Sequence, residues 1–443
     1  MHAATVNGHS SGIMNSRRDE ALAILENNPL PVKGDEGYAK FSVDEAFAPD
    51  YGINIARVPF DAGNTDAFSC LIPKVSSLTA TVVNDHLELS DNMKRNLPEG
   101  VTICTIAEAS ELMPGVVEKY YGRIADRYPQ VALNTLLAQE GLFVHVARNV
   151  SLNRPVQITN LLVAAADFMA VRRVLIVMEE GSAAEILSCD HTRSADHSYL
   201  VSQVIEISLA RGASLAWYDL EESSAKTTRI SSLFACQASD SRLIVNGNTL
   251  FGGRTRNEYK ITADGDATDT ELSGMVIASG CQLTDNNTSV VHSGRHGSSR
   301  QLFKYVVDDD ASGAFEGLIK VDAGAEHTEA FQTNRNLLAS YGSRMHTRPQ
   351  LLINCDEVKC SHGATTGRLD EQALFYMRQR GIPFEEARIM LMQAFMADVI
   401  DMVKLEGLRD RLRYLVEKRF SGSRVLCSQC QAQGVSAEGG GLQ

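Results

Sequence analysis

The sequence predicts a mainly β core with a helical segment at each end. From about Asn153 to Cys360, short runs that alternate apolar and polar residues recur roughly every ten to fifteen residues, almost without proline. Gly, Asp, Asn or Ser separate these runs, which is typical of turns between strands. Before and after this region, apolar residues recur three and four positions apart, which indicates helices.

Composition and charge narrow the class of protein. The 443 residues are 44% hydrophobic and 22% charged, as in ordinary soluble globular proteins, and a chain of this length suggests two or three structural units. The formal net charge of -13 argues against binding to nucleic acid or to an anionic membrane surface, because both normally require a clustered basic surface. The expected partners are therefore proteins or small molecules.

The N-terminal residues 1–18 are polar and lack the apolar stretch of a secretory signal, so we predict a disordered leader and a cytoplasmic protein. The most apolar long stretch, residues 158–178, is interrupted by Asp167, Arg172 and Arg173. Charges at these positions would be costly at the centre of a bilayer. This stretch is therefore interpreted as two buried strands and not as a membrane span.

A mixed helical domain is predicted over residues 19–152. Residues 19–28 have the pattern of a short helix, and residues 97–139 that of helices broken at Pro114 and near Pro129. The alternation in residues 141–150 then predicts a strand that leads into the core.

The β core is predicted over residues 153–365, and its pattern fits two architectures. One is an antiparallel sandwich or barrel, and the other is a solenoid in which each coil stacks on the previous one. Asn246-Gly247 is the kind of pair that forms tight hairpins, but it lies inside a strand-like run and supports a hairpin only modestly. The spacing alone favours the solenoid slightly.

The helical period returns over residues 366–422. Three helices are predicted, over residues 370–381, 383–407 and 408–420. Asp370 is a suitable N-cap and Gly381 a suitable residue just beyond the C-terminal end of the first helix. Residues 423–443 are polar and rich in glycine, so we predict a flexible tail.

Several motifs that could carry chemistry are weak. The sequence has no GxxxxGK[ST] phosphate loop, so a partner would have to supply any ATPase activity. Residues 292–300 and the acidic run 308–310 are interpreted as turns between strands. Cys427 and Cys430 have the spacing of half a zinc site or a redox pair, but no second pair follows them.

Cys360 and His362 form the strongest candidate site. Residues two apart in a strand point to the same face, so this thiol and imidazole could converge on one ligand. A thiolate binds soft metals, and a neutral imidazole binds iron or zinc. Two ligands do not close a tetrahedral site, so a substrate or a second protein would have to supply the rest. The spacing also leaves open a purely structural role for both side chains.

The residues around this pair resemble a known family. Residues 356–382, with the sequence DEVKCSHGATTGRLDEQALFYMRQRGI, closely resemble the signature of the SufD branch of the SufB/SufD family of the SUF iron-sulfur cluster assembly machinery. The resemblance extends to other segments, namely residues 27–47, 132–150, 155–158, 316–340 and 346–353. SufB sequences typically have Glu-His-Glu-Ala where this chain has Cys-Ser-His-Gly-Ala, which favours the SufD branch.

The resemblance implies a right-handed parallel β-helix core that pairs edge to edge with the β-helix of SufB. His362, with Cys360 beside it, would lie at that interface opposite a SufB cysteine, where an iron-sulfur cluster forms transiently. No permanently bound cofactor is implied. The C-terminal helices would bind the ATPase SufC, and our candidates for that surface are Phe375, Arg378, Arg380, Gly381, Ile382, Ala387, Leu391 and Phe395.

The sequence thus predicts a scaffold subunit and not an enzyme. A SufB-like role, with the main sulfur-accepting site on this chain, stays as the alternative, and the isolated subunit could form a homodimer. A carbohydrate-active β-helix enzyme is the third candidate. It would need paired carboxylates or basic residues along one face of the coils, and no such set stands out in the sequence.

Overall fold

The computed structural model describes residues 12–55, 77–125 and 128–422. Contacts within the chain divide the described residues into two units. The first contains the residues up to 368, and the second contains residues 369–422. The predicted tail, with Cys427 and Cys430, lies outside the described residues, as do residues 1–11 of the predicted leader.

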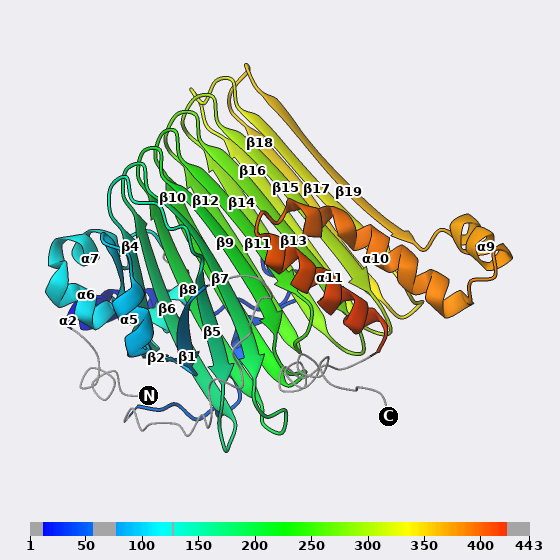
Figure 1. Ribbon diagram of the computed structural model, residues 1–443, viewed down its shortest axis with the longest axis horizontal. Helices are drawn as coiled ribbons and strands as arrows, with labels where there is room; N and C mark the ends of the chain where they lie inside the picture. The colour runs from blue at the N-terminus through cyan, green and yellow to red at the C-terminus, as the bar shows by residue number, and fades with distance from the viewer. Residues whose placement is uncertain (1–11, 56–76, 126–127, 423–443) are drawn as a thin grey trace, which may run out of the picture. The chain divides into compact units, whose positions relative to one another are not determined.

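Two large sheets form the first unit (Figure 1). The ten-stranded sheet has the order β19-β17-β15-β13-β11-β9-β7-β5-β1-β2, and the nine-stranded sheet has the order β18-β16-β14-β12-β10-β8-β6-β4-β3. The strands of the first sheet are β1 (Leu78–Val83), β2 (His86–Glu88), β5 (Val156–Leu162), β7 (Ala183–Thr192), β9 (Ser214–Glu222), β11 (Arg242–Thr249), β13 (Asp269–Ala278), β15 (Ser298–Val307), β17 (Glu329–Leu338) and β19 (Lys359–Arg368). Those of the second are β3 (Val101–Thr105), β4 (Leu142–Val146), β6 (Phe168–Met178), β8 (Tyr199–Leu209), β10 (Thr227–Gln237), β12 (Arg254–Ala263), β14 (Leu283–His292), β16 (Ser312–Val321) and β18 (Arg344–Ile353).

The order of the strands shows the path of the chain. From β5 onwards the chain passes from one sheet to the other with every strand, and each strand pairs in parallel with the strand two places later. This path is a parallel β-solenoid of about eight turns. The prediction of a β-helix core is therefore confirmed, and the sandwich alternative is wrong.

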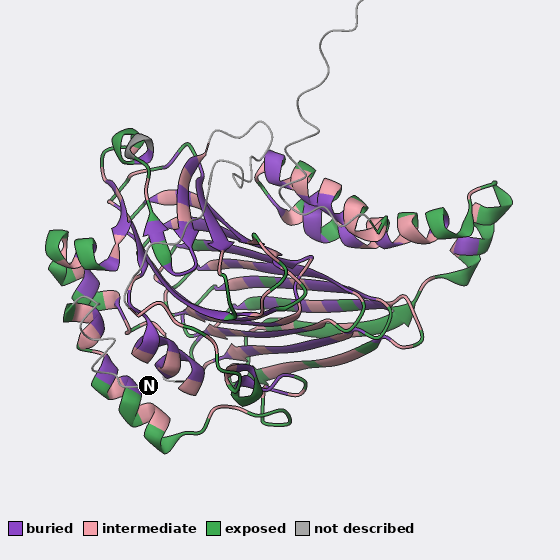
Figure 2. Cartoon of the chain, turned by 90° about the horizontal axis from the view of Figure 1, so that it is seen from below, coloured by how far each residue is buried: buried purple, intermediate pink, exposed green. Residues whose placement is uncertain are grey.

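Alternation along the strands fills the interior of the solenoid. Every second side chain points inwards, and the apolar residues of successive coils stack into one cluster that runs from Leu78 to Phe315. The residues of β5 and β6 are buried along their whole length, so residues 158–178 do form two buried strands. Burial declines in β18 and β19, which end the sheets (Figure 2).

Glycines allow successive coils to approach closely. Asn246 and Gly247 lie inside β11 and form no hairpin turn. A Cβ on Gly247 would lie 2.0 Å from the hydroxyl oxygen of Tyr259, so this position is glycine because a buried tyrosine on β12, in the opposite sheet, occupies the space. The turn-forming pair in the sequence therefore reflects packing and not a turn.

The short helices of the first unit are α2 (Gly12–Asn15), α3 (Arg18–Asn27), α4 (Val43–Phe47), α5 (Asp91–Asn96), α6 (Ile106–Leu112), α7 (Pro114–Tyr120) and α8 (Pro129–Leu137). Those labelled in Figure 1 lie at the N-terminal end of the solenoid, whereas Glu45 of α4 pairs with Arg254 of β12, further along it. Pro114 and Pro129 occupy the first position of α7 and α8, where the missing N–H costs nothing, so both predicted breaks are confirmed. The predicted disordered leader is wrong from residue 12 onwards, because α2 is helical and Met14 is fully buried.

A buried ion pair joins these helices to the solenoid. Arg173 on β6 donates from Nη2 to Oε2 of Glu206 on β8 at 2.7 Å, and the two side chains are 1% and 0% exposed. The same carboxylate accepts the backbone N–H groups of Gly122, Ile124 and Ala125. Because a buried charge is tolerated only when it is paired and hydrogen-bonded, this pair fixes the segment between α7 and α8 on the outer face of the sheet.

The second unit is helical, as predicted. Its helices are α9 (Glu371–Gln379), α10 (Phe384–Met402) and α11 (Glu406–Phe420). The Asp370 side chain accepts the N–H groups of Gln372 and Ala373, and Gly381 follows α9 with φ +87°, so both predicted helix boundaries are confirmed. None of the helices in the described part of the chain is long and apolar enough to cross a membrane.

Candidate functional site

The candidate pair lies on β19, the last strand of the solenoid. Among the described strands, β19 pairs with β17 alone, so its other side is a free edge of the ten-stranded sheet. β18 is likewise the last strand of the nine-stranded sheet, and it contains Pro349, which lacks an N–H group and is tolerated at a sheet edge. The two edge strands together form what we call the open end of the solenoid, residues 344–368.

Cys360 and His362 point to the same face of β19. They lie in register with Ala330 and Gln332 of β17, which are 0% and 2% exposed. This is the inward face, so the thiol and the imidazole continue the interior of the solenoid to its edge. The prediction that residues two apart would share a face thus agrees with the register.

The two side chains differ in their surroundings. Cys360 is half-buried and packs against a small apolar cluster that contains Ala330, and burial raises the pKa of its thiol. His362 is exposed. Within the described part of the chain, no three His, Cys, Asp or Glu side chains are grouped to hold a metal ion.

A line of buried polar side chains leads to His362. The hydroxyl of Thr288 and the amide nitrogen Nε2 of Gln332 both donate to Oε1 of Gln301, at 2.9 Å and 3.0 Å. Gln332 is the neighbour of His362 in the next strand. These hydrogen bonds join β17, the strand that pairs with β19, to the preceding coil.

The open end also exposes apolar and basic side chains. Leu352 and Ile353 are 48% and 41% exposed, and Tyr341, in the turn just before β18, is 90% exposed. Basic residues occupy both edge strands, namely Arg344, Arg348, Lys359 and Arg368. Charged side chains on an edge discourage indiscriminate pairing, whereas exposed apolar groups favour a specific partner.

The predicted SufC surface belongs to the second unit. Phe375, Arg378, Arg380 and Gly381 are exposed, and the half-buried members of the set are Ile382, Leu391 and Phe395. Ala387 is fully buried, so its place in the predicted surface is wrong.

Sequence reasoning missed two aromatic residues of this surface, Tyr376 and Phe384, which are 59% and 47% exposed. The guanidinium groups of Arg380 and Arg378 lie 4.9 Å and 5.9 Å from their ring centroids. Aromatic and arginine side chains are the groups that most often dominate binding surfaces, and their high exposure was not evident from the helical period.

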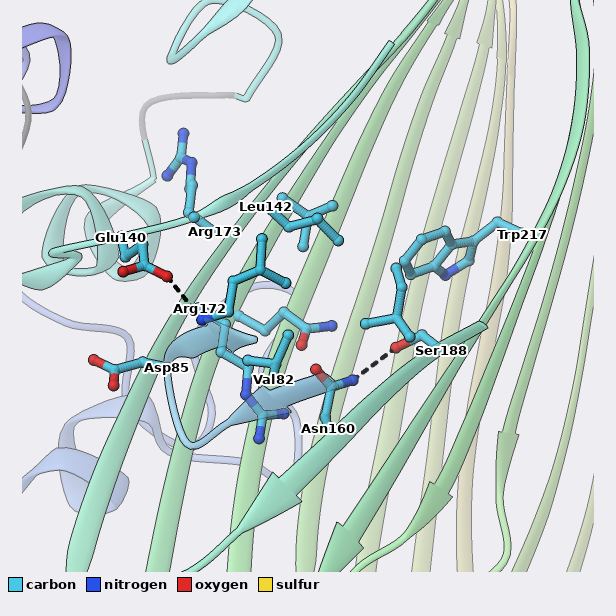
Figure 3. Close-up of a pocket in the computed structure, with 14 residues that line it drawn as sticks. Val82, Asp85, Glu140, Leu142, Asn160, Arg172, Arg173, Ser188 and Trp217 are labelled. Carbon is cyan, nitrogen blue, oxygen red and sulfur yellow. Dashed lines mark hydrogen bonds between the residues drawn. The ribbon is translucent and has the colours of Figure 1, made fainter. Parts of the chain in front are cut away.

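A cavity at the N-terminal end of the solenoid was not predicted (Figure 3). Arg172, Asn160, Ser188 and Trp217 contribute to its wall, and Asn160 donates to the Ser188 hydroxyl at 2.9 Å. Arg172 also donates from Nε to the backbone oxygen of Asn84 at 2.6 Å. The cavity wall therefore combines these polar groups with apolar side chains of the interior cluster, among them Ile158 and Trp217.

Behind the cavity lies a chain of buried ion pairs. Asp190 binds Arg172 on one side and Arg229 on the other, and Arg229 also donates to Asp219 at 2.6 Å. Burial alone would raise the pKa of Asp190, but the two guanidinium groups hold it below its ordinary value. Charges alternate along this chain, so each is compensated inside the solenoid.

At Glu221, a further buried carboxyl group, burial has the largest effect on the pKa. It raises the pKa of Glu221 to about 7, although Arg229 lies nearby and the hydroxyls of Thr255 and Ser223 donate to the carboxyl oxygens. Glu221 therefore takes up a proton more readily than an exposed glutamate does.

The fold and the candidate site define a parallel β-solenoid whose last strand presents a thiol and an imidazole at a free edge. Residues 161–395 match the family model described as "SUF system FeS cluster assembly, SufBD core domain", and residues 1–158 match the SufBD protein N-terminal region. The chain belongs to the SufBD family.

Curated relatives agree with this assignment. A SufBD family protein of Synechocystis is 28% identical over 425 residues, covering 94% of this chain and 93% of the relative. The iron-sulfur cluster assembly protein SufD of Bacillus subtilis is 30% identical, over 75% of this chain and 76% of its own length. SufD of Escherichia coli is 33% identical over 42% of this chain and 44% of its own length.

Proposed function

We propose that this protein is a non-catalytic scaffold subunit that helps to assemble iron-sulfur clusters in the SUF system. The observation that supports this most directly is the placement of Cys360 and His362 on one face of a strand whose other edge is free. A thiolate and an imidazole are suitable ligands for iron. A cluster bound there would be cargo, held until it is passed on, and not a resident cofactor.

A second solenoid is the proposed partner at the open end. A strand with a free edge can extend its sheet by pairing with a strand of another chain, and the partner's side chains would then supply the remaining ligands. We propose that this partner is SufB, a member of the same SufB/SufD family.

The exposed aromatic surface of α9 and the start of α10 is the proposed contact with the ATPase SufC. This surface combines Phe375, Tyr376 and Phe384 with two arginines. The chain itself has no phosphate loop, so the energy of ATP would enter through such a partner. A cytoplasmic location is part of the same proposal.

The ligand role is tested with His362→Ala, with cluster yield and complex formation measured separately. We expect a loss of cluster yield of about tenfold or more on an intact complex, because one ligand of the site is missing. His197→Ala, in the turn before β8, is the matched control and should leave the yield unchanged. A normal yield from His362→Ala on an intact complex would refute the ligand role.

The two interfaces are tested by pull-down with SufB and SufC. Leu352→Asp places a charge on the edge strand β18 and should weaken capture of SufB alone, whereas Phe375→Asp should weaken capture of SufC alone. Leu112→Asp is the control for both, since Leu112 is 68% exposed on α6 and belongs to neither proposed surface. If Leu352→Asp and Leu112→Asp capture SufB equally well, the open end is not the interface.

A further inference from the structure

A second thiol lies close to the candidate site. Cys355 is in the five-residue loop 354–358 that connects β18 to β19, and it is half-buried like Cys360. Cys355 lies outside the Cys-Ser-His motif, so no role was predicted for it. Its position becomes informative only in the folded chain.

Both thiols pack against the same apolar cluster. The cluster consists of Ile319, Val321, Ala325 and Ala330, and the half-buried side chains that contact it include those of Cys355 and Cys360. Among the six cysteines in the described residues, these are the two that pack there. The fold therefore brings both sulfur atoms to one corner of the solenoid.

Hydrogen bonds to the preceding coil hold this corner. The N–H of Asn354 donates to the Val321 oxygen at 2.9 Å, and the N–H of Lys359 donates to the Thr328 oxygen at 2.9 Å. Between them, the oxygen of Glu357 accepts the N–H of His327 at 2.7 Å. The loop is thus fixed at both ends to the coil beneath, against whose apolar cluster both cysteines pack.

We propose that Cys355 and Cys360 form a dithiol that a small disulfide, such as oxidised glutathione, converts to an intramolecular disulfide. One protein thiolate attacks the oxidant, which releases one small thiolate and leaves a mixed disulfide. The second protein thiolate attacks the protein sulfur of that bond and releases the second small thiolate. The protein loses two electrons and two protons, and the oxidant is reduced to two thiols.

The disulfide would regulate the candidate site. It removes the Cys360 thiolate as a ligand and ties the loop to β19, while His362 keeps its place. This consequence rests on the proposed function, whereas formation of the disulfide itself does not. The two are therefore measured separately.

The test uses the full-length protein treated with oxidised glutathione and digested with trypsin without reduction. Trypsin cleaves after Lys359, so Cys355 and Cys360 fall in different peptides. The second peptide runs from Cys360 to Arg368. We expect these two peptides to be linked, with a mass two hydrogen atoms below their sum, and with no glutathione retained. In Cys355→Ser, glutathione should instead stay on Cys360, because no second thiol resolves the mixed disulfide.

Cys281→Ser is the matched control, since Cys281 is exposed elsewhere on the solenoid. It should form the linked peptides as the unmodified chain does. Retention of glutathione on Cys360 in the unmodified chain, with no linked peptides, would overturn the proposal. If the linked peptides form but oxidised and reduced protein support the same cluster yield, the dithiol is retained and its effect on the proposed function is refuted.

Discussion

His362 lies directly opposite Gln332 in the parallel ladder between β19 and β17, and the pair marks the border between the buried interior and the exposed edge. Substitutions at these two positions should separate stability from function. Gln332→Ala removes a buried hydrogen bond to Gln301 and should lower the free energy of unfolding by about 1–3 kcal/mol. His362→Ala, on an exposed edge, should change it by about 0.5 kcal/mol or less.

Urea denaturation of the two variants provides the measurement. Equal losses of stability in both would show that His362 is packed as tightly as Gln332, contrary to its exposure.

Glu221 should make the protein less stable as the pH rises. Because burial raises the pKa of Glu221 from 4.5 to about 7, the unfolded chain releases this proton before the folded chain does. Its contribution to stability is therefore present below about pH 4.5 and falls by about 3 kcal/mol as the pH rises to about 7. Glu221→Gln should remove this fall, so the free energy of unfolding of the variant should rise relative to that of the unmodified chain between pH 5 and 8. Denaturant unfolding of both proteins at each pH measures this difference.

Glu258 should show the opposite dependence. Burial would raise its pKa, but Arg256 and Lys260 lower it to about 2. Its contribution is thus present above about pH 4.5 and is lost, by about 3 kcal/mol, as the pH falls towards 2. Glu258→Gln should therefore cost more stability at pH 7 than at pH 3. A cost that is independent of pH would contradict the pairing with Arg256.

Gly294 is predicted to be intolerant of any side chain. A Cβ at this position would lie 2.0 Å from the backbone oxygen of Gly265 in the preceding coil, which cannot move aside without breaking the stack. Gly294→Ala should lower the free energy of unfolding by at least about 2 kcal/mol. Gly363 on β19 has nothing within 4 Å of such a Cβ, so Gly363→Ala should be neutral or slightly stabilising. Thermal unfolding of both variants tests the contrast.

Much of the fold could be predicted because its signals are local. The alternation in the strands, the cap at Asp370 and the glycine at Gly381 depend on neighbouring residues, and each holds in the structure. The shared face of Cys360 and His362 follows from the period of two in a strand. The Asn246-Gly247 pair was misleading because its glycine makes room for Tyr259 of the opposite sheet and does not form a turn.

The remaining features depend on distant parts of the chain. Arg173 and Glu206 are 33 positions apart, and in sequence each resembles an ordinary solvated charge. Cys355 packs against the cluster that contains Ala325 because one coil stacks on another, and no short motif in the sequence predicts this contact. The lengths of the loops between strands determine which residues of different coils come into contact. The alternation pattern in the sequence does not give these lengths.

The proposed pairing at β18 and β19 has a consequence for the supply of this protein in the cell. A copy produced in excess of the proposed partner would expose the backbone donors and acceptors of both strands, together with Tyr341 and Leu352, to strands of other chains. Under that proposal we expect balanced synthesis of the two chains, or rapid removal of the surplus.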